Sequence, residues 1–135
     1  MTAIGEALKS YIVSSTAVNA VVSGRVHENV IPEVSSRPNI WFGRSSQEQV
    51  TCFDGGAGLF KSRFALECIA VTADVAIDLA DLVRSRLHAS SSTTAGVNIR
   101  GMLVEDQDDD YMPKGIGGDV GLHVSALEVL VMYEN

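Results

Sequence analysis

The stretch Leu59–Leu87, LFKSRFALECIAVTADVAIDLADLVRSRL, decides the fold because its hydrophobic period changes once, near Thr72. Before that point apolar side chains alternate with charged ones, which predicts a strand over Leu59–Val71 with one buried face. After it, apolar residues recur at helical spacing, which predicts a helix over Thr72–Leu87, and Thr72 or Asp74 can cap its start. A strand that runs directly into an amphipathic helix therefore forms the centre of the expected fold.

Two further helices are expected toward the N-terminus. Apolar residues at helical spacing predict a helix over Thr2–Val13, which Thr2 can cap. Ser15 or Thr16 can cap a second, shorter helix over Ala17–Val22, and Gly24 can end it. Prolines at positions 32 and 38 exclude helix from the next segment, which is therefore expected to be an extended connection from residue 25 to residue 37.

Short strands and polar turns are expected between this connection and the central strand. Asn39–Arg44 and Val50–Phe53 are interpreted as strands, separated by a polar turn over Ser45–Gln49. The glycine-rich stretch Asp54–Gly58 then predicts a flexible loop or the end of a hairpin.

Strands also dominate the C-terminal third. Ser90–Gly96 is expected to be a polar loop, Val97–Glu105 a strand, and Gln107–Gly118 an acidic and then glycine-rich connection. The last strand, Val120–Tyr133, changes the parity of its apolar residues near Ala126, which predicts a β-bulge there. Residues 1–135 are therefore expected to form a single α+β domain, with a mostly antiparallel β-sheet and helices packed on one face.

The composition argues against a grip on nucleic acid. The chain has 135 residues and a formal net charge of −7, and its lysines and arginines form no cluster. Because such a grip depends on clustered basic residues, DNA or RNA binding is not expected. No run of apolar residues approaches the length of a membrane span and no basic leader precedes one, so a protein of the cytoplasm is expected.

The sequence offers no catalytic residues, no cofactor motif and no metal-ligand spacing. Cys52 and Cys68 are far from any CxxC pattern, and Cys68 is expected to be a buried free thiol. His27, His88 and His123 are scattered, so they form no helical metal pair. The chain is therefore expected to act by binding other proteins.

Two segments are the candidates for that binding. The acidic run, with carboxylates at Glu105, Asp106, Asp108, Asp109 and Asp110, lacks the spacing of a calcium loop and is expected to face a partner or a solvated space. The second candidate is a loop or hairpin that orders on a partner, and its residues are Gln47, Glu48, Gln49, Asp54, Gly55, Gly56 and Gly58.

Three stretches together resemble a known family. The first is GRVHENVIP (Gly24–Pro32) with RPNI (Arg37–Ile40), and the second is the strand–helix unit of Leu59–Leu87, which contains LECIAVT (residues 66–72). The third is MLVED (residues 102–106) with DYMP (residues 110–113), before a strand that ends in VMY (residues 131–133). In their order and spacing these stretches resemble the small tail-completion and tail-terminator proteins of tailed bacteriophages.

The resemblance implies a structural role rather than an enzymatic one. It implies a homo-oligomeric ring, in that family a hexamer, that is assembled in the host cytoplasm and becomes part of the virion neck. Such a ring caps the head-proximal end of the tail tube, stops its polymerisation and docks to the head-completion or connector protein. DNA would pass through the ring without specific binding, and an acidic lumen would repel its phosphates.

Three alternatives stay open at this point. The protein could be a head-side connector or adaptor of the same neck. It could be a small metal-dependent enzyme built on the acidic run, or a free cytoplasmic binding domain. The size and symmetry of its assembly would separate the ring from the last two.

Overall fold

This computed structural model describes residues 3–31, 36–52, 55–113 and 121–134. Within them it has three helices and six strands. In chain order they are α1 (Ala3–Val13), α2 (Thr16–Val22), β1 (Val26–Glu28), β2 (Asn39–Cys52), β3 (Gly55–Ala70), α3 (Ala73–Leu87), β4 (Ser90–Thr94), β5 (Val97–Met112) and β6 (Leu122–Glu134).

The six strands form one mixed sheet in the order β1-β2-β3-β6-β5-β4. β1 runs parallel to β2, whereas the other neighbouring strands are antiparallel. The α+β class is confirmed, but the sheet is mixed, because part of the expected connection between residues 25 and 37 pairs with β2 as a short strand. Three residues are too few to show the alternation that identifies a strand.

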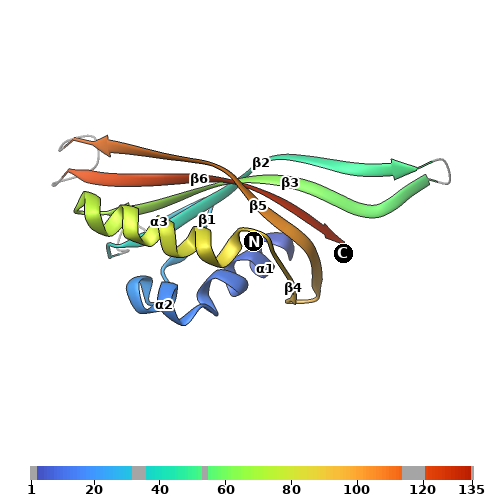
Figure 1. Ribbon diagram of the computed structural model, residues 1–135, viewed down its shortest axis with the longest axis horizontal. Coiled ribbons are helices and arrows are strands. Elements are labelled where there is room, and N and C mark those ends of the chain that lie inside the picture. Colours follow the sequence, from blue (N-terminus) through green and yellow to red (C-terminus); the bar gives the residue numbers. More distant parts are fainter. Residues whose placement is uncertain (1–2, 32–35, 53–54, 114–120, 135) are drawn as a thin grey trace.

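All three helices lie on one side of the sheet, and the core lies between them and the strands (Figure 1). Phe42, Phe64 and Leu66 fill this core from the strands, and their side chains are fully buried. Helix α3 buries Ala76, Leu79 and Val83 against the same core, as the helical spacing after Thr72 predicts. Long antiparallel strands with helices on one face therefore organise the domain.

The helix ends largely follow the sequence. Thr72 is the N-cap of α3, where its hydroxyl accepts from the amide of Val75 at 3.4 Å, and Ser15 caps α2 in the same way. Ser23 is the C-cap of α2, with a left-handed φ of 49°, and Gly24 follows it with a φ of 78°, as expected of a glycine that ends a helix. Thr2, the expected cap of α1, lies outside the described residues.

The region between residues 39 and 58 differs from the expectation. Instead of two short strands, a turn and a loop, β2 is one strand of 14 residues that pairs with β3 from Asn39 to Cys52. The predicted turn at Ser45–Gln49 falls within this strand, where a register shift between Arg44 and Ser46 accommodates it. Polar residues occur there because this part of the strand has exposed side chains on both faces.

The C-terminal third contains more strand than expected. Ser90–Thr94 is strand β4 rather than a loop, and β5 continues through the acidic run to Met112. The predicted bulge near Ala126 is wrong, because β6 pairs with β3 without any shift. Its parity changes because both faces are apolar: Leu122 and Val124 pack on Ile69 on the face opposite the helices. The register shifts are in the β5–β6 pairing instead.

No helix in the described part of the chain combines the length and the hydropathy required to cross a membrane.

Candidate functional site: an acidic sheet edge and a protruding arm

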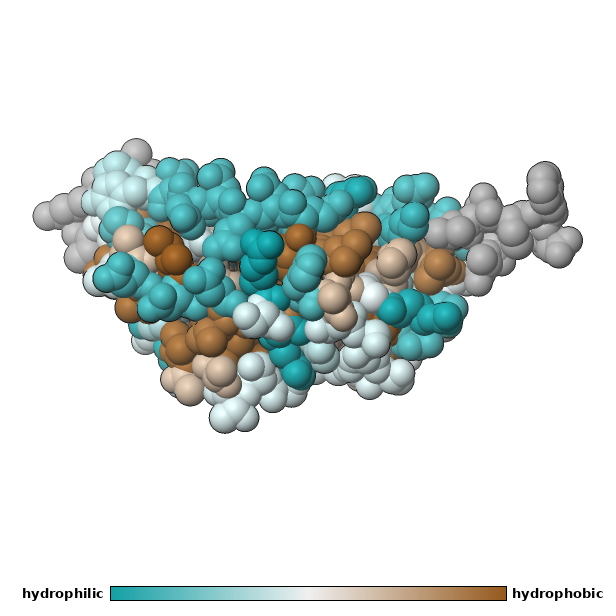
Figure 2. All heavy atoms as spheres, in the orientation of Figure 1, coloured by the Kyte–Doolittle hydropathy of each residue, from teal (hydrophilic) through white to brown (hydrophobic). Residues whose placement is uncertain are grey.

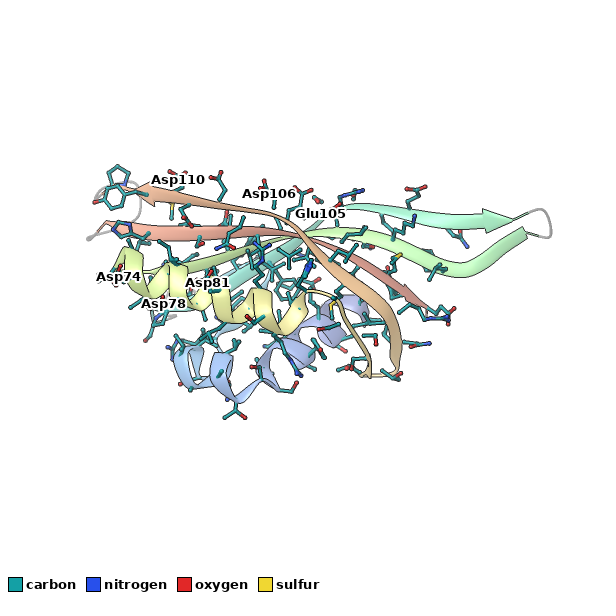
Figure 3. The ribbon with its side chains drawn as sticks, viewed as in Figure 1. Asp74, Asp78, Asp81, Glu105, Asp106 and Asp110 are labelled. Atoms are coloured by element: carbon teal, nitrogen blue, oxygen red, sulfur yellow. The ribbon has the colours of Figure 1, made fainter. Side chains whose placement is uncertain are left out.

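The acidic run lies within strand β5, not in a loop. Strand alternation places Asp106, Asp108 and Asp110 on the outer face of the sheet, away from the helices, whereas Asp109 points toward the helix side. Glu105 is the extra residue at the register shift between Val104 and Asp106. The run therefore divides into an outer row of three aspartates, of which Figure 3 labels Asp106 and Asp110, and two carboxylates with other directions.

Two members of the run have partners in neighbouring strands. The carboxylate of Glu105 pairs with the guanidinium of Arg63 on β3, with 3.0 Å between Arg63 Nε and Glu105 Oε1. Asp109 accepts a hydrogen bond of 2.6 Å from the hydroxyl of Ser125, a buried residue of β6. These contacts fix the two side chains, so they are less available to an outside partner than the outer row is.

The outer row borders a shallow groove on the face opposite the helices. Asp106 and Asp108 line it from β5, Glu128 lines it from β6, and Ala65 and Ala126 contribute small side chains. The groove has a volume of about 350 Å³. Its small residues leave backbone accessible between carboxylates, which suits contact with a protein surface better than enclosure of a small molecule.

A second acidic row lies on helix α3, close to the same edge. Asp74, Asp78 and Asp81 are exposed on this helix, and Figure 3 shows them below the strand that carries Asp106 and Asp110. Gln107 connects the two elements, since its amide nitrogen donates to Asp81 Oδ1 at 3.3 Å and its amide oxygen accepts from Arg84 at 3.2 Å. Carboxylates thus flank the edge of β5 from both sides.

These carboxylates do not form a metal centre. Among the described residues, no three His, Cys, Asp or Glu side chains come together in a group that could hold a metal ion. The three histidines are also far apart in the fold, in β1, at the end of α3 and in β6. His123 stacks on Tyr111 with ring centroids 4.7 Å apart, so its ring has a packing role.

The second candidate segment forms the outer part of the β2–β3 hairpin. β1 covers β2 only as far as Phe42, and β6 covers β3 only back to Leu59. Beyond these residues the hairpin continues as an arm (residues 43–58), which projects past the helices in Figure 1 and is two-stranded at its tip, beyond Gln49 and Leu59. A two-stranded ribbon gains little stability alone, so the arm is suited to binding a partner.

The candidate residues of this segment fall in strands of the arm. Gln47, Glu48 and Gln49 are exposed in β2, while Gly55, Gly56 and Gly58 belong to β3. Gly58 has a φ of 74°, which a side chain would strain. Asp54 lies outside the described residues. The segment is therefore a hairpin, and whether it orders on a partner stays a prediction.

Burial shifts the pKa of two side chains, Cys68 and His27, in the described part of the chain. Burial raises the pKa of the Cys68 thiol to about 12, which keeps it protonated and unreactive. Cys68 is thus the buried free thiol that the sequence predicts. Burial, followed by the charge of Lys9, lowers the pKa of His27.

Sequence reasoning missed the residues that contact the acidic run from elsewhere. Glu128, Ser125 and Asp81 are brought to it by pairing of β6 and packing of α3. The run itself held one usable signal: aspartates at 106, 108 and 110 alternate with Gln107, Asp109 and Tyr111, which is strand periodicity.

Between the grey ends of the view, hydrophilic residues follow the upper edge of the molecule in Figure 2, where β5 and β2 lie in Figure 1. The polar candidate residues therefore lie at the periphery of the sheet, on this surface and on the long hairpin. A family model for "Tail completion protein gp17" matches residues 6–134 of the chain. The chain belongs to this family of tail completion proteins. It is thus a structural protein of the tail or neck of a phage-type virion, as the resemblance of its three stretches indicates.

Solved structures contain the same fold. A chain in the structure "Virion of native gene transfer agent (GTA) particle" matches with a TM-score of 0.75 and 13% sequence identity. The match covers 98% of the tail completion protein described here and 95% of the other chain. A search of curated proteins gives no significant match. At this identity the likeness concerns the fold, which is shared over almost the full length of both chains.

Proposed function

We propose that this tail completion protein assembles into a ring of six copies at the head-proximal end of the tail tube. There it ends polymerisation of the tube and joins the tail to the head-completion or connector protein. It has no enzymatic activity and requires no metal or cofactor. The observation that carries the proposal is the family match, which extends over residues 6–134.

The shape of the subunit supports this role. A rigid sheet with one helical layer supplies a body that copies can pack side by side, and the arm of residues 43–58 extends beyond that body. Closed rings require two different surfaces on each copy, because the contact is repeated head to tail. The arm, which β2 and β3 form, can supply one of them, and it lies on the half of the strand order opposite the acidic β5.

The acidic outer face supports the proposal that the ring has a lumen through which DNA passes. In the ring, Glu105, Asp106, Asp108, Asp109 and Asp110 face the lumen or a neighbouring copy, and those of the outer row contribute most of the free carboxylates. Six copies bring these charges around one axis, where they repel the phosphates of passing DNA. If they crowd at the axis, added salt strengthens assembly, because it screens repulsion beyond about 8 Å at physiological ionic strength.

Mass and symmetry test the ring directly. Light scattering on the purified protein should give six times the mass of the 14.4 kDa chain, and negative-stain images should show a ring with a central hole. A stable monomer at all concentrations contradicts the ring. Pull-down with tail tube protein and with head-completion protein then separates a tail terminator, which binds the end of the tube, from a head-side connector, which binds only the head.

Neutralising the aspartates tests the lumen. With Asp108, Asp109 and Asp110 all replaced by Asn, a lumen position predicts rings that assemble as well or better but particles with lower infectivity or transfer. If the carboxylates instead pair with basic residues of a neighbour, such as Arg25 or Arg44, the ring itself dissociates. A variant unchanged in assembly, salt response and particle activity contradicts both positions.

A proline in the arm tests its contact with a partner. Gly56 pairs with Thr51 in the hairpin, and Gly56→Pro removes a backbone donor there. The variant should lose tail joining while its unfolding midpoint changes little, because the arm extends beyond the core. Gly56→Ala is the control that keeps the N–H group. Equal loss of joining and folding contradicts a partner-binding arm.

A further inference from the structure

One edge of the sheet is only partly covered. β4 pairs with β5 from Val97 to Met102, and among the described residues no strand pairs with the remainder of that edge, from Leu103 to Met112. β6 pairs with the other side of β5 over this length. An uncovered edge carries backbone donors and acceptors that can pair with a strand of another molecule.

Three amides on this edge are already hydrogen-bonded to side chains. The amide of Val104 donates to His88 Nδ1 at 3.1 Å. The amide of Gln107 donates to Asp106 Oδ1 at 3.0 Å, and that of Tyr111 donates to Asp110 Oδ1 at 2.8 Å. Each of these acceptors occupies a donor that an incoming strand would need.

The register of β5 explains why these three amides share one edge. Along an antiparallel strand, alternate residues direct their N–H and C=O groups to the same neighbour. The backbone groups of Met102 and Val104 point away from β6. The Met102 carbonyl accepts from the amide of Ala89, and the Val104 amide donates to His88. The shift between Val104 and Asp106 then changes the parity, so that Gln107 and Tyr111 face the same way.

We propose that His88, Asp106 and Asp110 close the exposed edge of β5 against strand pairing with a second copy of this chain. His88 acts from the end of α3, where pairing with β4 stops, and the two aspartates act farther along the strand. The occupant that the edge excludes is an open strand of another copy, such as β2 beyond Phe42, where pairing with β1 ends.

The surrounding charge acts in the same direction. Asp74, Asp78 and Asp81 lie on the helix side of this edge, while Asp106, Asp108 and Asp110 lie on the outer side. A second copy has a net charge of −7, so repulsion is the alternative explanation that the variants must separate from occupation of the amides. Charged side chains on edge strands are a common protection against edge-to-edge aggregation.

The inference goes beyond the ring and does not depend on it. It accounts for two aspartates of the acidic run by the backbone groups that they occupy, whatever faces the run in the virion. It also predicts that copies do not associate by extending their sheets through β5.

Three double variants separate hydrogen bonding from charge. Asp106→Ala with Asp110→Ala removes both acceptors and both charges. Asp106→Asn with Asp110→Asn removes the charges but keeps an acceptor oxygen at each position. Asp108→Ala with Glu128→Ala is the matched control, since it removes two carboxylates from the same outer face and neither of them is bonded to an edge amide of the described chain. Circular dichroism and urea unfolding verify that each variant is folded.

The experiment measures amide hydrogen exchange at Gln107 and Tyr111 and the size of the soluble species by sedimentation velocity. In the Ala variant we expect both amides to exchange about fivefold faster than in the unchanged protein. We also expect species larger than those of the unchanged protein at the same concentration. The Asn variant and the control should match the unchanged protein in both measurements.

Each other result overturns the proposal. Unchanged exchange in the Ala variant means that the two carboxylates do not protect the amides. Faster exchange without larger species means that a freed edge does not pair. Larger species in the Asn variant or in the control mean that charge, rather than occupation of the amides, limits association.

Discussion

Asp106 on β5 lies directly opposite Glu128 on β6, so two carboxylates are cross-strand neighbours on the outer face of the sheet. Like charges in this arrangement reduce stability, and nothing in the core requires them. The Asp106–Glu128 pair therefore lowers the stability of the fold, as is expected where a surface serves contact with a partner rather than folding.

Replacing Glu128 by Gln should stabilise the isolated protein. We expect the free energy of unfolding to rise by about 0.2–1 kcal/mol, because the repulsion with Asp106 is removed. Urea denaturation measures this change. Glu48→Gln is the control, since Glu48 lies opposite Lys61 and its neutralisation removes an attraction instead. Equal stabilisation by both variants would show that net charge, not the Asp106–Glu128 pair, limits stability.

Cys68 should be inert in the folded protein. Its side chain is fully buried, and burial raises the pKa of the thiol to about 12. In a Cys52→Ser variant, iodoacetamide at about pH 8 should alkylate Cys68 about a hundredfold more slowly in buffer than in urea. The reason is that the thiolate is the reactive form and burial suppresses it. Rapid alkylation of the native protein would mean that Cys68 is accessible.

Arg86 should hold helix α1 to helix α3. Its guanidinium donates to the Tyr11 carbonyl at 3.0 Å and to Ser14 Oγ at 2.6 Å, and it lies 3.9 Å from the centre of the Tyr11 ring. Arg86→Ala should lower the free energy of unfolding by about 1–3 kcal/mol. Arg86→Lys should lose less, since it keeps the charge but not the planar stacking.

The neighbouring Arg84 is the control for Arg86. It lies in the same last turn of α3 and bonds only to the half-buried side chain of Gln107 among the described residues. Arg84→Ala should change the free energy of unfolding by less than about 0.5 kcal/mol. A loss equal to that of Arg86→Ala would assign the effect to the helix terminus instead of the contact with α1.

His27 should make the protein less stable in mild acid. Its pKa is lowered by burial and then by Lys9, so the unfolded chain binds a proton at a higher pH than the folded chain does. The contribution of the neutral imidazole is therefore present above its usual pKa and is lost as the pH falls through the lower folded value. Urea unfolding at about pH 7.5 and about pH 5.5 should show a smaller loss for His27→Gln than for the unchanged protein. Lys9→Gln should fall between them, and equal losses in all three would exclude His27 as the source.

Periodicity in the sequence was sufficient for the centre of the fold. The change of period near Thr72 predicts α3 and the part of β3 from Leu59 onward, because both place one apolar face on the same core, but it does not predict the first four residues of β3, 55–58. Ser15 and Thr72 are found at caps because their hydroxyls satisfy amides that the helix leaves free. The last strand is also where the sequence places it, within two residues of its start.

The outer strands could not be predicted in the same way. β1, β4 and the acidic half of β5 contain few apolar residues, and the β2–β3 arm has polar residues on both faces. Their pairing depends on backbone hydrogen bonds to neighbours that are distant in sequence, such as Asp110 with Val124. Composition marks such segments as loops, so the sequence identified the acidic run but not its strand geometry or the residues that face it.

Because the arm of residues 43–58 extends beyond the core, recognition of a partner and folding of the domain depend on different residues of this short chain. Its strands continue past the last residues that pair with β1 and β6, and the side chains described in it, at residues 44–49, are exposed and lie outside the buried core. Substitutions there can change what the protein recognises while the core continues to fold as before. Related tail completion proteins should therefore diverge fastest in the arm, and exchange of arms between them should transfer partner preference without redesign of the rest.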